Sequence, residues 1–222
     1  MRVNEIYYAL QGEGVLTGVP MVFVRLQGCN LAEYCSYCDT KYAQSSVGGE
    51  DLAPLEVLTR ILGEDAEGRW VCITGGEPLY QERELKQLVL LLHEYSCQVE
   101  IETNGTLPVP EWYEIVNSWV ADVKCPSSGV TSFVFDWLNL RKQDQLKFVV
   151  GSEEDLRFVE SIVRTVTLVP QVIVSPALFC DSAGRVMLGD SWLQAVSDFC
   201  LENRLRMSIQ MHKIVYGNRR GK

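Results

Sequence analysis

The sequence predicts an α/β fold, a partial and incomplete TIM-type β/α barrel whose strands are mostly parallel. Apolar strand-like runs alternate with amphipathic helical patterns almost to the end of the chain, which favours a parallel sheet with helical crossovers. Polar side chains follow strand after strand, and parallel barrels build their sites at those carboxyl ends. No repeat or linker divides the 222 residues, so we expect one domain over 1–222, too short for eight full β/α units.

The expected elements follow from apolar periodicity. Strand-like runs lie at 20–27, 69–74, 98–103, 119–124, 146–150, 171–175 and 205–211. Helical patterns lie near 52–62, 80–96, 110–117, 153–165 and 191–203. The helical period is clearest in the second pattern, at Leu85, Leu88, Val89 and Leu92. Ser152, followed by three acidic residues, is expected to cap the helix over 153–165.

Charge and hydropathy exclude several classes of function. The chain has 20 Lys and Arg against 29 Asp and Glu, a net charge of −9, which argues against nucleic acid because phosphate contacts need a basic face. No apolar run approaches the roughly 20 residues of a membrane span. The first residues lack the apolar stretch of a secretory signal. We therefore expect a cytoplasmic protein with neither a nucleic-acid nor a membrane partner.

The eight cysteines need an explanation, because disulfides are rare in the cytosol. Those that stand singly among other residues are expected to pack as small hydrophobes: Cys72, Cys97, Cys125, Cys180 and Cys200. Cys29, Cys35 and Cys38 instead cluster in a loop after the first expected strand. Thiolates this close favour a [4Fe-4S] cluster with one open iron, whereas structural zinc prefers four ligands in two pairs. The spacing alone leaves cluster, zinc and coincidence open.

Polar groups end most of the expected strands. They are Thr74–Glu77, Glu102–Gly105, Asp122–Lys124, Ser175 and Gln210–His212. Any one of them could be a solvated strand end. Together with the cysteine loop they predict one site at the carboxyl edge of the sheet.

Two of these motifs resemble those of radical S-adenosylmethionine enzymes. The first is the cysteine loop, with Tyr37 directly before Cys38, and the second is the Gly75–Gly76 pair that follows Thr74. Two glycines would let the strand edge approach the methionine amino group, where a Cβ would collide. The resemblance is closest to the branch that forms 7-carboxy-7-deazaguanine, and it covers nearly the whole chain, through residues 8–14, 23–31, 39–40, 100–105 and 210–218.

The sequence departs from the family's patterns at two points. Five residues separate Cys29 from Cys35, where three are commonest, and Asp122–Lys124 replaces a frequent S-P-K. Extra loop residues cost little closure entropy, so the departure concerns the shape of the loop more than the cluster.

The resemblance implies a lyase that converts 6-carboxy-5,6,7,8-tetrahydropterin to 7-carboxy-7-deazaguanine with release of ammonia, in queuosine or archaeosine biosynthesis. It implies a [4Fe-4S] cluster, S-adenosylmethionine and Mg²⁺ as cofactors. It also implies a reducing electron donor of the flavodoxin or ferredoxin type and a homodimer. The alternatives left open are an activase that installs a glycyl radical on a partner enzyme, and a metal-binding module without catalysis.

The same resemblance assigns roles to individual residues. The cluster ligands would be Cys29, Cys35 and Cys38, and Thr40 would bind Mg²⁺. S-adenosylmethionine would contact Tyr37, Cys38, Asp39, Gly76, Asp122, Val123, Lys124 and Ser175. The pterin and its carboxylate would contact Leu10, Gln11, Gly12, Glu13, Arg25, Thr74 and His212.

Several of these residues have a structural alternative. Arg25 could pair with an acid in the core, and His212 could be a satisfied structural histidine. Glu77 is expected to act mainly in the first turn of a helix, where the helix dipole stabilises a carboxylate. The basic tail at 219–222 is expected to be solvated.

Overall fold

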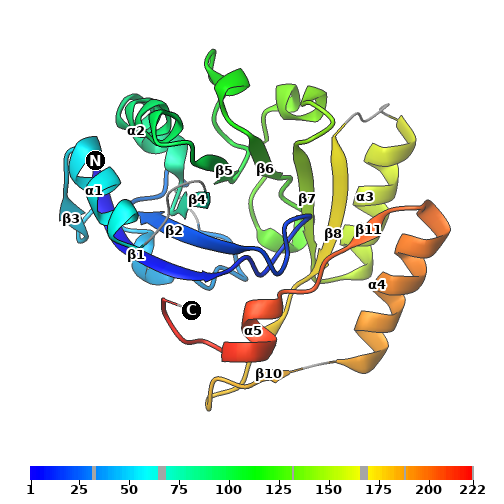
Figure 1. The fold of residues 1–222 in the computed structure, drawn as a ribbon. Helices are drawn as coiled ribbons and strands as arrows, with labels where there is room; N and C mark the ends of the chain where they lie inside the picture. The colour runs from blue at the N-terminus through cyan, green and yellow to red at the C-terminus, as the bar shows by residue number, and fades with distance from the viewer. Residues whose placement is uncertain (32–33, 65–68, 132, 166–169, 188, 222) are drawn as a thin grey trace.

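The computed structural model describes residues 1–31, 34–64, 69–131, 133–165, 170–187 and 189–221. Its main sheet has nine strands in the order β11-β8-β7-β6-β5-β4-β2-β1-β3 (Figure 1). Neighbours from β2 to β11 are parallel, whereas β1 and β3 add antiparallel strands at one edge. The described sheet is open, with β3 and β11 at its two ends, so the expected partial barrel is confirmed.

The strands of this sheet have the following bounds: β1 (Arg2–Leu10), β2 (Pro20–Leu26), β3 (Glu50–Asp51), β4 (Trp70–Gly75), β5 (Gln98–Thr103), β6 (Ser118–Asp122), β7 (Gln145–Val150), β8 (Gln171–Pro176) and β11 (Arg206–Met207). A separate hairpin pairs β9 (Phe179–Cys180) with β10 (Val186–Met187). The α-helices are α1 (Pro54–Gly63), α2 (Glu82–Glu94), α3 (Glu153–Thr165), α4 (Asp190–Asn203) and α5 (Met211–Tyr216).

The helices bury the apolar faces that their sequences predict. The expected stripe on α2, Leu85, Leu88, Val89 and Leu92, is fully buried. Ser152 meets the start of α3 as expected, because its hydroxyl accepts a hydrogen bond from the backbone N–H of Asp155. Among the described residues no helix is both long and apolar enough to cross a membrane.

The predicted helix over 110–117 was wrong. Only a 3₁₀ turn forms, over Tyr113–Ile115, and Val116 is already extended. The reason is that Asn117 pairs with Val99 of β5 through its backbone N–H and its side-chain Oδ1. The chain must therefore be extended before β6 begins.

The predicted strand over 205–211 is also mostly absent. Only Arg206 and Met207 form β11, and Met211 already begins α5. The backbone N–H of Met211 donates to the carbonyl of Gly12, so the chain leaves the sheet to meet the loop that follows β1.

Strand β1 was not predicted from the sequence. Only Val3 of its nine residues is buried, so it lacks the apolar run by which buried strands are found. It pairs antiparallel with β2, and the Tyr7 ring stacks on Phe23 with 5.2 Å between ring centroids. This strand places Tyr7 and Ala9 on the inner wall of the barrel.

Asp155 joins α3 to the loop that follows β6. Its buried carboxylate accepts hydrogen bonds from the backbone N–H groups of Ser127, Gly151 and Ser152, and from the Ser127 hydroxyl. A single side chain thus fixes two loops at the carboxyl edge of the sheet.

We predict that Asp155→Ala lowers the free energy of unfolding by about 3 kcal/mol, because it leaves several backbone donors without a partner. The matched control is Glu153→Ala, which removes an exposed carboxylate from the same helical turn and should cost no more than about 1 kcal/mol. Urea denaturation of both variants measures the difference. Equal losses would show that only the helix dipole is involved.

Candidate active site

The carboxyl ends of the parallel strands surround a cavity of about 270 Å³. Nearly all residues that the sequence singled out line it, including the three loop cysteines, Thr40, Arg25 and His212. Two do not. Val123 is fully buried in the hydrophobic core, and Ser175 is buried with a hydroxyl that has no hydrogen-bond partner among the described residues.

The cysteine loop is held against the sheet by its own backbone. The N–H groups of Gly28 and Cys29 donate to the carbonyls of Ala43 and Gln44, and that of Ser36 donates to Ser128 in the loop after β6. Cys29, Cys35 and Cys38 are partly buried and form no disulfide. Burial raises the pKa of the Cys29 and Cys35 thiols, so metal binding would release protons from them.

The loop geometry fits a cluster better than a single ion. The described residues contain one group of potential ligands whose atoms lie within 4.8 Å of one another, and it is Cys72, Glu100 and Glu102 rather than the loop cysteines. One zinc ion would need three thiolates about 4 Å apart, since Zn–S bonds are about 2.3 Å long. An iron–sulfur cluster can be held by thiolates that lie farther apart, because each cysteine ligates a different iron atom.

Gly75 and Gly76 allow β4 to touch the cysteine loop. A Cβ on Gly75 would lie 2.4 Å from the carbonyl oxygen of Leu26, and one on Gly76 would lie 2.1 Å from that of Gly28. Neither position can hold a larger residue without moving backbone. The pair therefore brings the end of β4 beside the start of the loop, and both glycines line the cavity.

Glu77, next in the chain, is completely buried. Its carboxylate accepts hydrogen bonds from the backbone of Leu79 and Asn104 and from the Thr103 hydroxyl. It caps the 3₁₀ turn over Pro78–Gln81, as expected of a residue at a helix start, and also fixes the end of β5.

Four carboxylates line the cavity, and three of them have a cation partner. Glu13 Oε2 lies 2.7 Å from Lys147 Nζ, Asp122 Oδ2 lies 2.6 Å from Lys124 Nζ, and Asp39 Oδ2 lies 3.1 Å from Lys213 Nζ. Burial alone would raise the pKa of Glu13, but the charges of Lys147 and His212 outweigh it and hold that pKa at about 2. Each of these three carboxylates therefore has a cation beside it that balances its charge.

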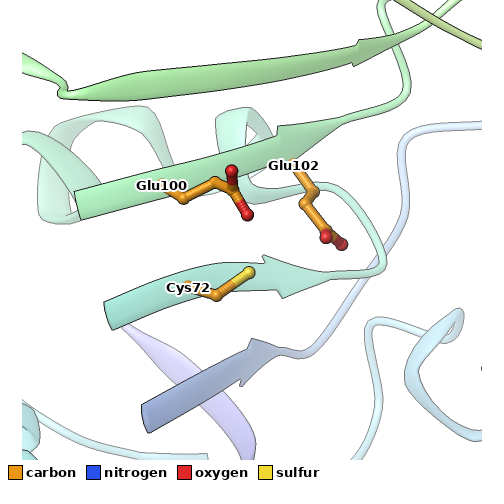
Figure 2. Close-up of side chains that lie close together, drawn as sticks. All are labelled: Cys72, Glu100 and Glu102. Atoms are coloured by element: carbon orange, nitrogen blue, oxygen red, sulfur yellow. The ribbon is translucent and has the colours of Figure 1, made fainter. Parts of the chain in front are cut away.

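Glu102 is the fourth carboxylate. Among the described residues no cation lies within ion-pair distance of it, although it and Lys147 attract each other through the cavity. It accepts hydrogen bonds from the Thr74 hydroxyl at 2.8 Å and from Gln11 Nε2 at 3.2 Å. Figure 2 shows its side chain at the end of β5, beside Glu100 on the same strand and Cys72 on β4. Its neutral partners leave Glu102 able to accept further hydrogen bonds from a ligand.

Glu100 is buried beside Glu102. It accepts hydrogen bonds from Gln11 Nε2 at 2.6 Å, Gln145 Nε2 at 3.1 Å and the Ser118 hydroxyl at 3.2 Å. Burial, reinforced by the charge of Glu102, raises the pKa of Glu100 to about 8. The Gln11 amide donates to both carboxylates, so the group with Cys72 is a hydrogen-bonded network rather than a vacant cation site.

Arg25 pairs with an acid and also faces the cavity. Its Nε donates to Glu5 at 2.8 Å and its Nη2 to the Tyr7 hydroxyl at 2.9 Å. His212 lies directly against Gly12, where a Cβ would meet its ring at 2.3 Å, and its Nε2 lies 3.9 Å from Asp39. In the tail expected to be solvated, Arg219 and Arg220 are exposed, but Arg220 also contacts Asn4, Glu5 and Tyr42; Lys222 lies outside the described residues.

Sequence reasoning placed Glu102 and Gln210 among the polar groups of one site but gave neither an individual role, and it missed Tyr7 and Lys147, which line the cavity, and Glu5, which binds Arg25. One signal was available. Glu100 and Glu102 alternate along an apolar strand, which places both carboxylates on one face of a buried sheet. The contact of Gln210 with Glu13 could not have been predicted, because it joins residues 197 positions apart.

We predict that Glu13→Gln lowers the free energy of unfolding by about 3–5 kcal/mol at pH 7, because it leaves Lys147 buried without its partner. Lys147→Met added to Glu13→Gln should restore much of the loss. The folded pKa lies below the usual 4.5, so the contribution of Glu13 is complete above pH 4.5 and is lost as the pH falls toward 2. Urea denaturation across this range tests both points; a loss that does not depend on pH would contradict them.

Comparisons with known proteins agree with this geometry. Residues 23–119 match the family model described as the Radical SAM superfamily. A 7-carboxy-7-deazaguanine synthase from Methanospirillum hungatei JF-1 is 37% identical over 97% of this chain and 85% of its own length. Another from Koribacter versatilis is 37% identical over 97% of both chains. The crystal structure of QueE from Escherichia coli has the same fold, with a TM-score of 0.72 at 24% identity over 95% of this chain and 94% of its own. The chain therefore belongs to the 7-carboxy-7-deazaguanine synthase family of radical S-adenosylmethionine proteins.

Proposed function

We propose that this protein converts 6-carboxy-5,6,7,8-tetrahydropterin to 7-carboxy-7-deazaguanine with release of ammonia, as a carbon–nitrogen lyase of deazapurine biosynthesis. The observation that carries the proposal is the composition of one cavity. It contains three loop cysteines, two glycines at the end of β4, an arginine and a carboxylate, Glu102, that forms no ion pair with the described residues. The names of the relatives support the same reaction.

The cofactors would occupy the end of the cavity at the cysteine loop. Cys29, Cys35 and Cys38 would hold a [4Fe-4S] cluster, which when bound supplies the electron that cleaves S-adenosylmethionine to start radical chemistry. Gly76 offers backbone to the methionine part of that cofactor, and Tyr37, Asp39, Asp122 and Lys124 line the same space. Val123 and Ser175 lie outside the wall, so they would act through their neighbours.

The substrate would lie between two groups of opposite charge. Arg25 suits the 6-carboxylate, because its guanidinium is charged and its Nη1 has no hydrogen-bond partner among the described residues. The resemblance implies that Glu13 contacts the pterin, but Lys147 and Gln210 already contact both Glu13 oxygens, so Glu13 is a poor acceptor for the guanidine-like edge of the ring. We infer that Glu102 accepts this edge, while the backbone of Leu10–Glu13, Thr74 and His212 enclose the ring.

The remaining assignments stay predictions from the resemblance. Thr40 lines the cavity and would ligate Mg²⁺ through its hydroxyl, a hard oxygen ligand. A flavodoxin- or ferredoxin-like protein would supply electrons, and the enzyme would work as a cytoplasmic homodimer with one domain per chain.

The direct test is an anaerobic assay of reconstituted protein with the carboxytetrahydropterin, S-adenosylmethionine and a reductant, with and without Mg²⁺. We expect 7-carboxy-7-deazaguanine to form without a protein partner. A glycyl-radical activase would instead need a partner enzyme. A protein that binds a cluster yet forms neither product nor 5′-deoxyadenosine would be a metal-binding module.

We predict that Cys35→Ala abolishes turnover and cluster binding, whereas Cys97→Ala, which changes a buried cysteine remote from the cavity, retains most of both. Iron and sulfide content, measured beside product formation, separates loss of the cluster from loss of fold. Equal losses in the two variants would refute the ligand assignment.

A further prediction concerns Glu102. Glu102→Gln should weaken binding of 6-carboxypterin about ten- to a hundredfold, because a neutral amide accepts hydrogen bonds less strongly and presents a donor to a donor. Binding of S-adenosylmethionine should not change. The corresponding lumazine, with oxygen in place of the 2-amino group, is the control ligand. The wild type should bind the lumazine weakly, and Glu102→Gln should bind it with the same weak affinity. If the substitution weakens both ligands equally, recognition of the amino group by Glu102 is ruled out.

A further inference from the structure

The register between β1 and β2 shifts at Asn4. Val3 stands opposite Leu26, but Glu5 stands opposite Arg25, so β1 contains one more residue than β2 across this interval. An extra residue of this kind is a β-bulge, and it turns the following side chains to the other face of the sheet. Val3 packs in the core with Leu26, whereas Glu5 faces the same side as Arg25.

Glu5 joins three other side chains. Its Oε1 accepts hydrogen bonds from Arg25 Nε at 2.8 Å and from the Tyr42 hydroxyl at 2.9 Å, and its Oε2 lies 3.5 Å from Arg220 Nη2. Tyr7 binds Arg25 Nη2. Two of the three nitrogens of the Arg25 guanidinium are therefore occupied behind the cavity wall, while Nη1 has no partner among the described residues.

The C-terminal segment of the chain contacts the same bulge. The Asn4 Oδ1 accepts a hydrogen bond from Arg220 Nη2 at 2.7 Å, and the Arg220 guanidinium lies 3.8 Å from the centroid of the Tyr42 ring. Residues 217–221 line the cavity, and Figure 1 shows the C-terminus beside β1. The C-terminal segment is thus fastened to β1 at the point where Glu5 supports Arg25.

The cluster of Glu5, Arg25 and Arg220 contains more positive than negative charges. Glu5 contributes one negative charge, while Arg25 and Arg220 contribute two positive charges. The unmatched positive charge lies next to the cavity, where a ligand carboxylate would complete the balance. Glu5 therefore has a role beyond a structural ion pair, because it sets the position of a charge that faces the cavity.

We propose that Glu5 is the positioning residue for Arg25, and that it and Asn4 fasten the C-terminal segment 217–221 to the rim of the cavity through Arg220. The proposal rests on the proposed function, since the ligand of Arg25 is the pterin carboxylate. Glu5 acts through Arg25 and does not touch the substrate.

The test compares the binding of 6-carboxypterin with that of pterin, which lacks the carboxylate, to the cluster-loaded protein. Glu5→Gln should weaken 6-carboxypterin about ten- to a hundredfold and pterin no more than about twofold, because only the carboxylate needs an oriented Arg25. Glu153→Gln, in an exposed ion pair on α3, is the matched control and should change neither. Equal weakening of both ligands, or none, would overturn the positioning role.

Two further measurements test the tail. Arg220→Ala changes an exposed residue and should weaken 6-carboxypterin about three- to tenfold, with Arg157→Ala as its control on α3. If Arg220 acts through Glu5, the double variant is no weaker than Glu5→Gln alone. Trypsin should also remove the two residues after Arg220 faster from Glu5→Gln than from Glu153→Gln. Additive losses or equal cleavage would overturn the tail contact.

The outcomes also separate this proposal from the function. A wild type without preference for 6-carboxypterin over pterin would overturn the role of Arg25 and with it that of Glu5. If that preference is present but no 7-carboxy-7-deazaguanine forms, the proposed reaction fails and the positioning role stands. Because Arg220→Ala leaves the interior unchanged, it gives an answer even if Glu5→Gln does not fold.

Discussion

Charges on the inner wall of the half-barrel are taken out of water, and the rest of the site depends on how they are compensated. A buried ion without a partner costs several kcal/mol, so each one fixes the position of another side chain. Glu13 meets Lys147, Asp122 meets Lys124, and the buried Lys213 meets Asp39, whose own side chain is exposed. Two of these pairs join segments more than a hundred residues apart, and so bring the first loop, the strand ends and the C-terminal helix around one space.

Once these ion pairs are formed, two charged side chains of the cavity can still bind a ligand. Within the described part of the chain, Glu102 accepts hydrogen bonds only from neutral donors, and one terminal nitrogen of Arg25 has no hydrogen-bond partner. The cavity therefore offers one negative and one positive contact, which suits a molecule with a donor edge and a carboxylate. The net charge of −9 gave no indication of this, because it sums over exposed residues that take no part in the site.

Periodicity predicted the parallel strands and the long helices, because burial on one or both faces leaves a regular apolar pattern. It failed for β1, whose inner face is polar, and for the segment after β11, whose path is set by Gln210 reaching Glu13. The cysteine loop and Gly75–Gly76 could be found because their chemistry needs fixed residue types at close spacing. Lys147 and Glu5 could not, since their roles arise from contacts with residues that only the fold brings near.

The central claim is that Arg25 and Glu102 select the two ends of a carboxylated 2-aminopterin. A crystal structure of the cluster-loaded protein with 6-carboxypterin and S-adenosylmethionine tests it most directly. We expect the ligand carboxylate within hydrogen-bond distance of Arg25 and the 2-amino edge on Glu102, with S-adenosylmethionine beside Gly76. A pterin bound in the reverse orientation, or with its 2-amino edge on Glu13, would contradict the account.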